Sequence, residues 1–167
     1  MQNMTPEQRQ YAVEQFLYQM AEACDNQDWD HYLSYFAENV EFHVPQWRSE
    51  HEYTQDPRRE MSLIYYANRA GLEDRVFRIR TGKSAACTPM PRTLHLINNV
   101  RCQPEQQGQQ VIHVNWLTHY YRFGESRHFF GRATYHLLWQ DQQLKITRKH
   151  VLVLNDKIDS VLDFYHL

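Results

Sequence analysis

The fold is decided by the two stretches VIHVNWLTHYYRF, residues 111–123, and RHFFGRATYHLLW, residues 127–139. In each stretch apolar side chains alternate with polar ones. One face carries Ile112, Val114, Trp116 and Tyr120, then Phe129, Ala133, Tyr135, Leu137 and Trp139; the other carries His113, Asn115 and His119, then His128, Arg132, Thr134 and His136. Alternation with a period of two predicts strands that bury one face in a core.

Helical periodicity precedes these strands. Thr5, Pro6 and Gln8 supply an N-cap, a proline at the first helical position and a capping-box partner, and apolar residues then recur at helical spacing. Besides this long helix, the sequence predicts a shorter helix over Trp29–Phe36 and a third over Leu72–Ile79. It also predicts brief strands at Val40–Val44 and Met61–Tyr66, and two further long strands at Thr93–Cys102 and Leu144–Leu154. Helices followed by a long antiparallel meander indicate an α+β fold, with a curved sheet wrapped around the N-terminal helices.

Composition is that of one globular domain over residues 1–167, with 42% hydrophobic and 23% charged residues. The net charge of −2 favours neither nucleic acid nor membrane as a partner. Residues 58–92 hold eight basic and three acidic side chains. The favoured interpretation is a solvated face, followed by an arginine-rich subunit interface, and a nucleic-acid patch ranks last. A polar N-terminus, no apolar span and three cysteines without CxxC spacing predict a cytoplasmic protein with reduced thiols.

The sequence predicts no metal site, no cofactor site and no catalytic residue in this chain. An iron–sulfur cluster held by Cys and His pairs is excluded, because no cysteine has a histidine within four residues. His113 and His119 share a strand face but lie about 20 Å apart, at ~3.3 Å per residue, which is too far for one ion. A metal site formed by histidines of different strands, such as His113 and His136, stays an open alternative, because the register between strands is not readable from the sequence. Nucleophile elbows and glycine-rich phosphate loops are absent.

One catalytic alternative survives, a stand-alone lyase or isomerase. A curved sheet closed by helices can enclose a pocket, where Asp30, His31 and a strand histidine such as His113, with Tyr121, would act as acid and base. The competing interpretation places Asp30 on a solvated helix face and the strand histidines beside polar neighbours at a subunit contact. A third alternative is a small-ligand binding or dimerising module without chemistry.

The segment DPRREMSLIYY, residues 56–66, which continues as ANRAGLEDRVFRIRTG to residue 82, resembles a signature of the β subunits of ring-hydroxylating dioxygenases. TPMPRT at residues 88–93, followed by His95 and Asn98-Asn99-Val100, fits the anthranilate type better than the benzoate type. The resemblance covers nearly the whole chain.

This resemblance implies a cone-shaped fold similar to nuclear transport factor 2 and scytalone dehydratase. It implies a hetero-hexamer of three α and three β subunits, in which the α subunit carries a Rieske [2Fe–2S] cluster and a mononuclear iron and a flavin reductase delivers electrons from NADH. Such a complex of the anthranilate type converts anthranilate, O2 and NADH to catechol, CO2 and ammonia. No catalytic residue is carried over to this chain.

The hypothesis is therefore a scaffold that contacts α subunits and other β subunits. The interface candidates are Trp47, Tyr65, Arg78, Arg80 and Trp116, with the core as an equal alternative for Trp116 and for Tyr66. Arg78 and Arg80 lie about 200° apart around a helix, so we expect one to anchor an interface and the other to cap the cluster internally.

Overall fold

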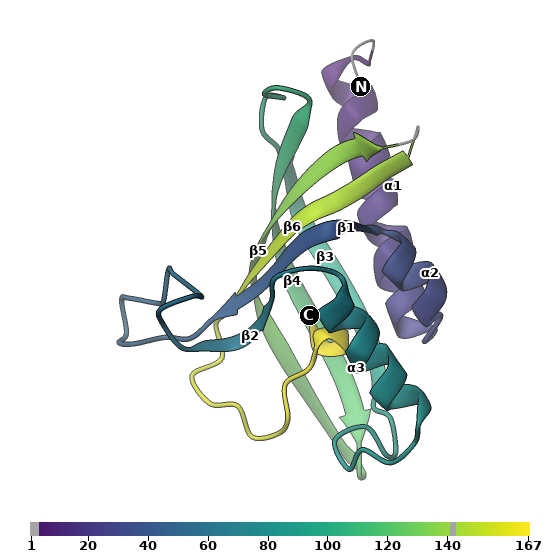
Figure 1. Ribbon diagram of the computed structural model, residues 1–167, viewed down its shortest axis with the longest axis vertical. Coiled ribbons are helices and arrows are strands. Elements are labelled where there is room, and N and C mark those ends of the chain that lie inside the picture. The colour runs from purple at the N-terminus through teal and green to yellow at the C-terminus, as the bar shows by residue number, and fades with distance from the viewer. Residues whose placement is uncertain (1–3, 141–142) are drawn as a thin grey trace.

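The N-terminal half supplies three α-helices to the part of the chain that the computed structural model describes, residues 4–140 and 143–167 (Figure 1). They are α1 (Pro6–Asp25), α2 (Trp29–Ser34) and α3 (Ala70–Arg80). The predicted capping box of α1 is confirmed: the Gln8 amide donates to Thr5 Oγ1 at 3.3 Å and the Thr5 amide donates to Gln8 Oε1 at 3.0 Å. The second helix is shorter than predicted, because Phe36 already pairs with Ile146 in the sheet.

The sheet has six strands in the order β2-β1-β6-β5-β4-β3. They are β1 (Phe36–Pro45), β2 (Ser62–Tyr66), β3 (Arg92–Cys102), β4 (Gln109–Arg122), β5 (Glu125–Gln140) and β6 (Gln143–Val153). The predicted meander is confirmed, since β3 to β6 pair antiparallel in succession. The strand expected at Val40–Val44 is twice as long in the structure, and it runs parallel to β6.

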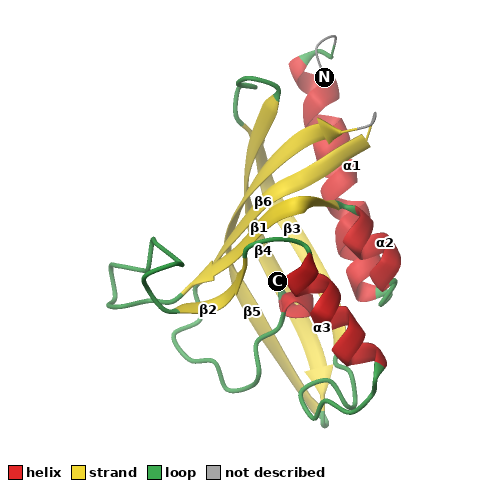
Figure 2. Cartoon of the chain, viewed as in Figure 1, coloured by secondary structure: helices red, strands yellow, loops and turns green. Residues whose placement is uncertain are grey.

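All the helices lie on one side of the sheet (Figure 2). We call the sheet face toward them the inner face and the opposite one the outer face. The predicted alternation is confirmed in β4, where Ile112, Val114 and Trp116 are buried while His113, Asn115 and Leu117 on the outer face are more exposed. The core therefore lies between the inner face and the helices.

The segment after β6 returns into this core, which the sequence analysis did not predict. Residues 163–167, which we call the C-terminal segment, contain a 3-10 turn at Phe164–His166, and all five are buried. The Phe164 ring stacks on Tyr32 of α2 at 5.5 Å between centroids. Lys149 of β6, itself fully buried, donates from Nζ to the Leu167 carbonyl oxygen at 2.9 Å. The interior of the cone is thus filled by the chain itself.

Among the helices that the structure describes, none is both long enough and apolar enough to cross a membrane.

Candidate functional site

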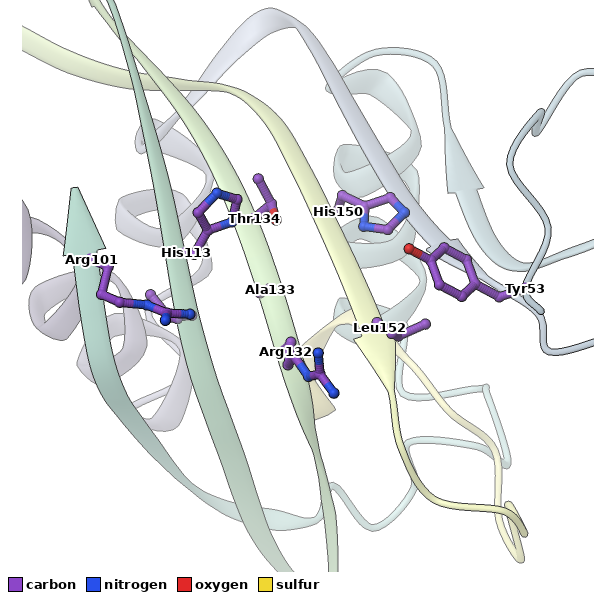
Figure 3. Close-up of a pocket in the computed structure, with 9 residues that line it drawn as sticks. Tyr53, Arg101, His113, Arg132, Ala133, Thr134, His150 and Leu152 are labelled. Carbon is purple, nitrogen blue, oxygen red and sulfur yellow. Dashed lines mark hydrogen bonds between the residues drawn. The ribbon is translucent and has the colours of Figure 1, made fainter. Parts of the chain in front are cut away.

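A groove of about 360 Å³ crosses the outer face of the sheet (Figure 3). Four of its residues come from four neighbouring strands and follow one another across the register: Arg101 on β3 pairs with His113 on β4, His113 with Thr134 on β5, and Thr134 with His150 on β6. Because paired residues of adjacent strands point to the same face, these four side chains meet on the outer surface.

A β-bulge at Asn99 directs Arg101 into the groove. Asn98 pairs with Asn115, yet Arg101 pairs with His113, so three steps along β3 match two along β4. Asn99 itself has a φ of 53°, in the left-handed region that asparagine tolerates. Without this extra residue Arg101 would stand opposite Ile112 and point inward. The bulge therefore adds a positive charge to the outer face.

The far end of the groove is closed by the loop between β1 and β2. Tyr53 lines the groove, 6.2 Å from the His150 ring, and lies edge-on to Trp47 at 5.3 Å between ring centroids. The Trp47 indole Nε1 donates to the Val153 carbonyl oxygen at 2.7 Å, which fixes the loop to the edge of the groove.

Arg101 and Arg132 supply positive charge to the groove, whereas burial keeps the His150 ring neutral at pH 7. Burial, helped by the neighbouring His43 and Arg148, lowers the pKa of His150 to about 4. Burial likewise lowers the pKa of His43, whose ring lies 5.2 Å from that of His150. Arg101 and Arg132 are exposed, and within residues 4–140 and 143–167 neither has an acidic side chain within 4.0 Å.

This arrangement can bind negative charge but offers no set of groups for making or breaking a bond. His113 Nδ1 is hydrogen bonded to Thr134 Oγ1 at 3.1 Å, and among the described residues no carboxylate is hydrogen bonded to its ring. In the described part of the chain no three His, Cys, Asp or Glu side chains gather closely enough to hold a metal ion. The exposed guanidinium groups of Arg101 and Arg132 instead suit carboxylate partners, which a planar guanidinium fork can contact.

The residues of the catalytic alternative are not brought together. Asp30 is exposed and pairs with Arg80 of α3, from Oδ2 to Nη2, at 2.8 Å. His31 Nε2 lies 3.1 Å from the Tyr35 hydroxyl, on the helix side of the sheet. His113 and Tyr121 point to the outer face instead. The sheet separates the two pairs, so they do not share a pocket.

The interior of the cone holds ionisable groups, but the C-terminal segment closes it. Burial lowers the pKa of Lys149 to about 8 and raises that of Cys24 to about 12, and both side chains lie in the core. The Lys149 ammonium lies over the rings of Phe42 and Tyr135, at 5.3 Å and 5.6 Å from their centroids. With the Leu167 carbonyl as its acceptor, Lys149 serves packing and has no access to a substrate.

The interface candidates from the sequence occupy different environments. Trp116 is only 6% exposed, so its side chain belongs to the core, the alternative that the sequence left open. Arg80 pairs with Asp30 inside the chain, whereas Arg78 is exposed and has no ion pair among the described residues. Trp47 and Tyr65 are half-buried against Tyr53 and His43 of the same chain.

The sequence did not predict that Arg101 and Arg132 line one groove. The outward orientation of Arg132 was readable from the alternation in its strand, and so was that of His113. Arg101 was not, because the Asn99 bulge inverts the alternation at the end of β3. The left-handed residue leaves no clear signal in the sequence beyond an Asn-Asn pair.

We expect acid to destabilise the fold well above the range where carboxylates protonate. The folded-state pKa is about 4 for His150 and about 3 for His166, against 6.5 for an ordinary histidine, so the unfolded chain binds these protons first. The contribution of the two neutral histidines to the free energy of unfolding is fully present above pH 6.5 and is lost as the pH falls toward 4. The melting temperature should drop by about 5–10 °C between pH 7 and pH 4.5.

Thermal melts followed by circular dichroism across this range measure the effect. His150→Gln should flatten the dependence, and the exposed His51→Gln serves as its matched control, with an unchanged slope. A melting temperature that stays constant down to pH 4.5 would contradict the burial of neutral histidines.

Comparison with known proteins gives consistent matches over nearly the full chain. The model of a family described as ring hydroxylating beta subunit matches residues 19–160. The anthranilate 1,2-dioxygenase small subunit of Acinetobacter baylyi is 54% identical over 157 residues, covering 94% of this chain and 96% of that protein. The benzoate 1,2-dioxygenase subunit beta of the same organism is 39% identical, covering 93% of this chain and 92% of its own length.

Solved structures give the same fold. The beta subunit of the benzoate 1,2-dioxygenase of Burkholderia mallei superposes with a TM-score of 0.80 at 32% identity, over 100% of both chains. A candidate scytalone dehydratase from Novosphingobium aromaticivorans superposes with a TM-score of 0.66 at 11% identity, over 92% of this chain and 91% of that one. The second match concerns the fold alone, and it confirms the expected cone-shaped α+β architecture.

Proposed function

The chain belongs to the family of ring-hydroxylating dioxygenase β subunits, and from this premise we propose that it is the small subunit of an anthranilate 1,2-dioxygenase, with a structural role. The observation that carries the proposal is the identity of 54% to an anthranilate small subunit over 94% of the chain. The benzoate counterpart reaches 39% over a similar span. The likeness of residues 88–100 to the anthranilate type supports the same assignment.

Two features of the described residues support a role through shape and contact. The C-terminal segment fills the interior, where the cone fold would otherwise have room for a substrate. The outer face presents exposed arginines beside apolar side chains, a combination suited to protein contacts.

The partner in this proposal is an oxygenase α subunit that holds the Rieske [2Fe–2S] cluster and the mononuclear iron. Three α and three β subunits form a cytoplasmic hetero-hexamer that receives electrons from NADH through a flavin reductase. The complex converts anthranilate, O2 and NADH to catechol, CO2 and ammonia. The chain acts as one domain, residues 1–167, that holds the α subunits at a fixed spacing, and Arg78, Tyr65 and Trp47 are its proposed contacts.

Co-expression with the α subunit tests this role. Affinity purification through a tag on this chain should recover the α subunit in equal amount, with the visible absorbance of a Rieske cluster. Together with the reductase and NADH, the complex should consume anthranilate faster than benzoate, and the α subunit expressed alone should lose most of this activity. Arg78→Glu should reduce the recovered α subunit, whereas the exposed Arg58→Glu should not.

Other outcomes would contradict the proposal. Faster turnover of benzoate would assign the complex to the benzoate type. A chain that purifies alone with stoichiometric iron, or that turns over a small substrate by itself, would refute the structural role.

A further inference from the structure

The groove on the outer face holds positive charge that the described residues of its own chain do not neutralise. Arg101 and Arg132 approach it from β3 and β5, with a single strand between them (Figure 3). Both are exposed, and within the described ranges neither takes part in an ion pair or a side-chain hydrogen bond. An arginine side chain stays charged at neutral pH and its planar fork matches a carboxylate, so an anionic partner suits this groove.

The same chain carries uncompensated negative charge at the tip of the β1–β2 loop. Residues 47–53 form a small hairpin, closed by the bridge between Trp47 and Tyr53, and we call the turn at residues 49–52 the acidic tip. Glu50 and Glu52 in this tip are exposed and have no ion pair in the part of the chain that is described. Arg48, next to the tip, is already paired with Glu60.

Internal hydrogen bonds hold the hairpin in one shape, which lets it act as a preformed contact. The Arg48 amide donates to the Glu52 carbonyl oxygen at 2.8 Å, and the Glu52 amide donates to Ser49 Oγ at 3.2 Å. At its base the Thr54 amide donates to the Gln46 carbonyl oxygen at 2.9 Å. A turn fixed in this way loses little conformational entropy when it binds.

The acidic tip does not reach the groove of its own chain. Tyr53 at the base of the hairpin lines the groove, yet Glu50 and Glu52 do not, and the loop extends away from the sheet edge near β2 (Figure 1). Complementary charges therefore occupy separate places on one molecule. They can pair with each other only between two molecules.

Apolar side chains beside the groove favour a protein as the partner over a free ion. Leu96, Leu117 and Phe130 follow one another across β3, β4 and β5 on the outer face. Leu96 is 43% and Phe130 38% exposed, and Arg132 borders both this row and the groove. Exposed apolar rows next to charge are typical of surfaces that another protein covers.

We propose that the groove receives the acidic tip of a second copy of this chain, with Glu50 and Glu52 pairing with Arg101 and Arg132. The contact joins two different surfaces, so each copy contributes a tip to one neighbour and a groove to another. Such head-to-tail contacts close into a ring when the rotation allows, and a ring of three copies matches the assembly of the proposed function. The inference deepens that function by naming the β–β contact.

Charge reversal tests the contact. The groove variant Arg101→Glu/Arg132→Glu and the tip variant Glu50→Arg/Glu52→Arg should each raise the dissociation constant for self-association by about tenfold or more, measured by sedimentation velocity. The variant that combines all four substitutions restores opposite charges and should regain association. The matched control Lys83→Glu/Lys157→Glu, on exposed lysines outside the groove, should associate as the unmodified chain does, and circular dichroism should show equal folding for all.

A cross-link locates the contact within the complete complex. Glu50→Cys combined with Arg132→Cys should give, under mild oxidation of the complex with the α subunit, a disulfide-linked ladder of this chain on non-reducing gels. Each single cysteine variant is the control and should give none. This readout applies equally when the isolated chain is monomeric.

The outcomes separate this inference from the proposed function. Unchanged association of the groove variant, no rescue by the fourfold variant, or a monomeric chain without a cross-link in the complex would each overturn the inference. Loss of binding to the α subunit alone, with β–β association intact, would assign the groove to that partner and also overturn it. If instead charge rescue holds while the chain fails to recover an α subunit, the proposed function fails and the contact stands.

Discussion

Replacing Arg75 by methionine is expected to destabilise the fold by about 3–5 kcal/mol, because it leaves a carboxylate buried without a counter-charge. Arg75 of α3 donates from Nε to Asp163 Oδ1 at 3.3 Å, and its Nη2 forms a second, ion-pair contact with Oδ2. The hydrogen bond from Arg75 to Asp163 also raises the pKa of the arginine. Asp163 is 3% exposed, so water cannot replace the guanidinium.

The loss should be concentrated in the C-terminal segment. Asp163 Oδ1 also accepts from the Phe164 amide at 2.9 Å, so the carboxylate anchors the turn that carries Phe164 into the core. Urea unfolding measures the change in the free energy of unfolding, and limited proteolysis detects release of the segment. In a double-mutant cycle, Asp163→Asn should cost much less in the Arg75→Met background than in the unmodified chain. A cost below about 1 kcal/mol for Arg75→Met would mean that the pair is effectively solvated.

Gly131→Ala should destabilise the protein by about 3 kcal/mol, since the added methyl group has no space. Gly131 of β5 pairs with Val153 of β6, and a Cβ at this position would overlap the carbonyl oxygen of Leu152 and lie 3.0 Å from its carbonyl carbon. The Trp116 Nε1 would be 3.3 Å away on another side. A backbone carbonyl cannot rotate away as a flexible side chain can, so β6 must shift.

Gly124→Ala is the matched control for this substitution. Gly124 lies in the turn between β4 and β5, with a φ of +81° and no atom within 4 Å of a built Cβ. Its substitution adds backbone strain without a clash and should cost about 1 kcal/mol. Urea denaturation of both variants measures the difference. Equal losses in the free energy of unfolding for the two variants would show that the β6 backbone at Leu152 shifts at little energetic cost.

Much of the fold was readable because its signals are local. The capping box at Thr5 and the alternation in the long strands each depend on neighbours a few residues away, and both are confirmed. The parallel pairing of β1 with β6 joins segments about a hundred residues apart, and no local pattern encodes it. The anchoring of Asp163 by Arg75, 88 residues away, escaped prediction for the same reason.

The candidate site divides in the same way. The outward orientation of His113 and Arg132 follows from the alternation of side chains along a strand, which is visible in the sequence. Arg101 joins them only through the left-handed residue Asn99. Tyr53 reaches the groove because the base of the hairpin is held against β6 by the hydrogen bond from Trp47 to Val153. Irregular backbone is decided by packing between distant segments, and composition does not reveal it.

The position of the C-terminal segment also sets the order of events during synthesis. Phe164 and Tyr165 complete a core whose helices are synthesised much earlier, and β1 can pair with β6 only after β6 has been made. Contacts with such long sequence separation slow folding, because the chain must close large loops before they form. A nascent polypeptide on the ribosome therefore keeps its aromatic core open until residues 143–167 have left the exit tunnel. Chaperones that shield apolar surface have their longest opportunity to bind during that interval.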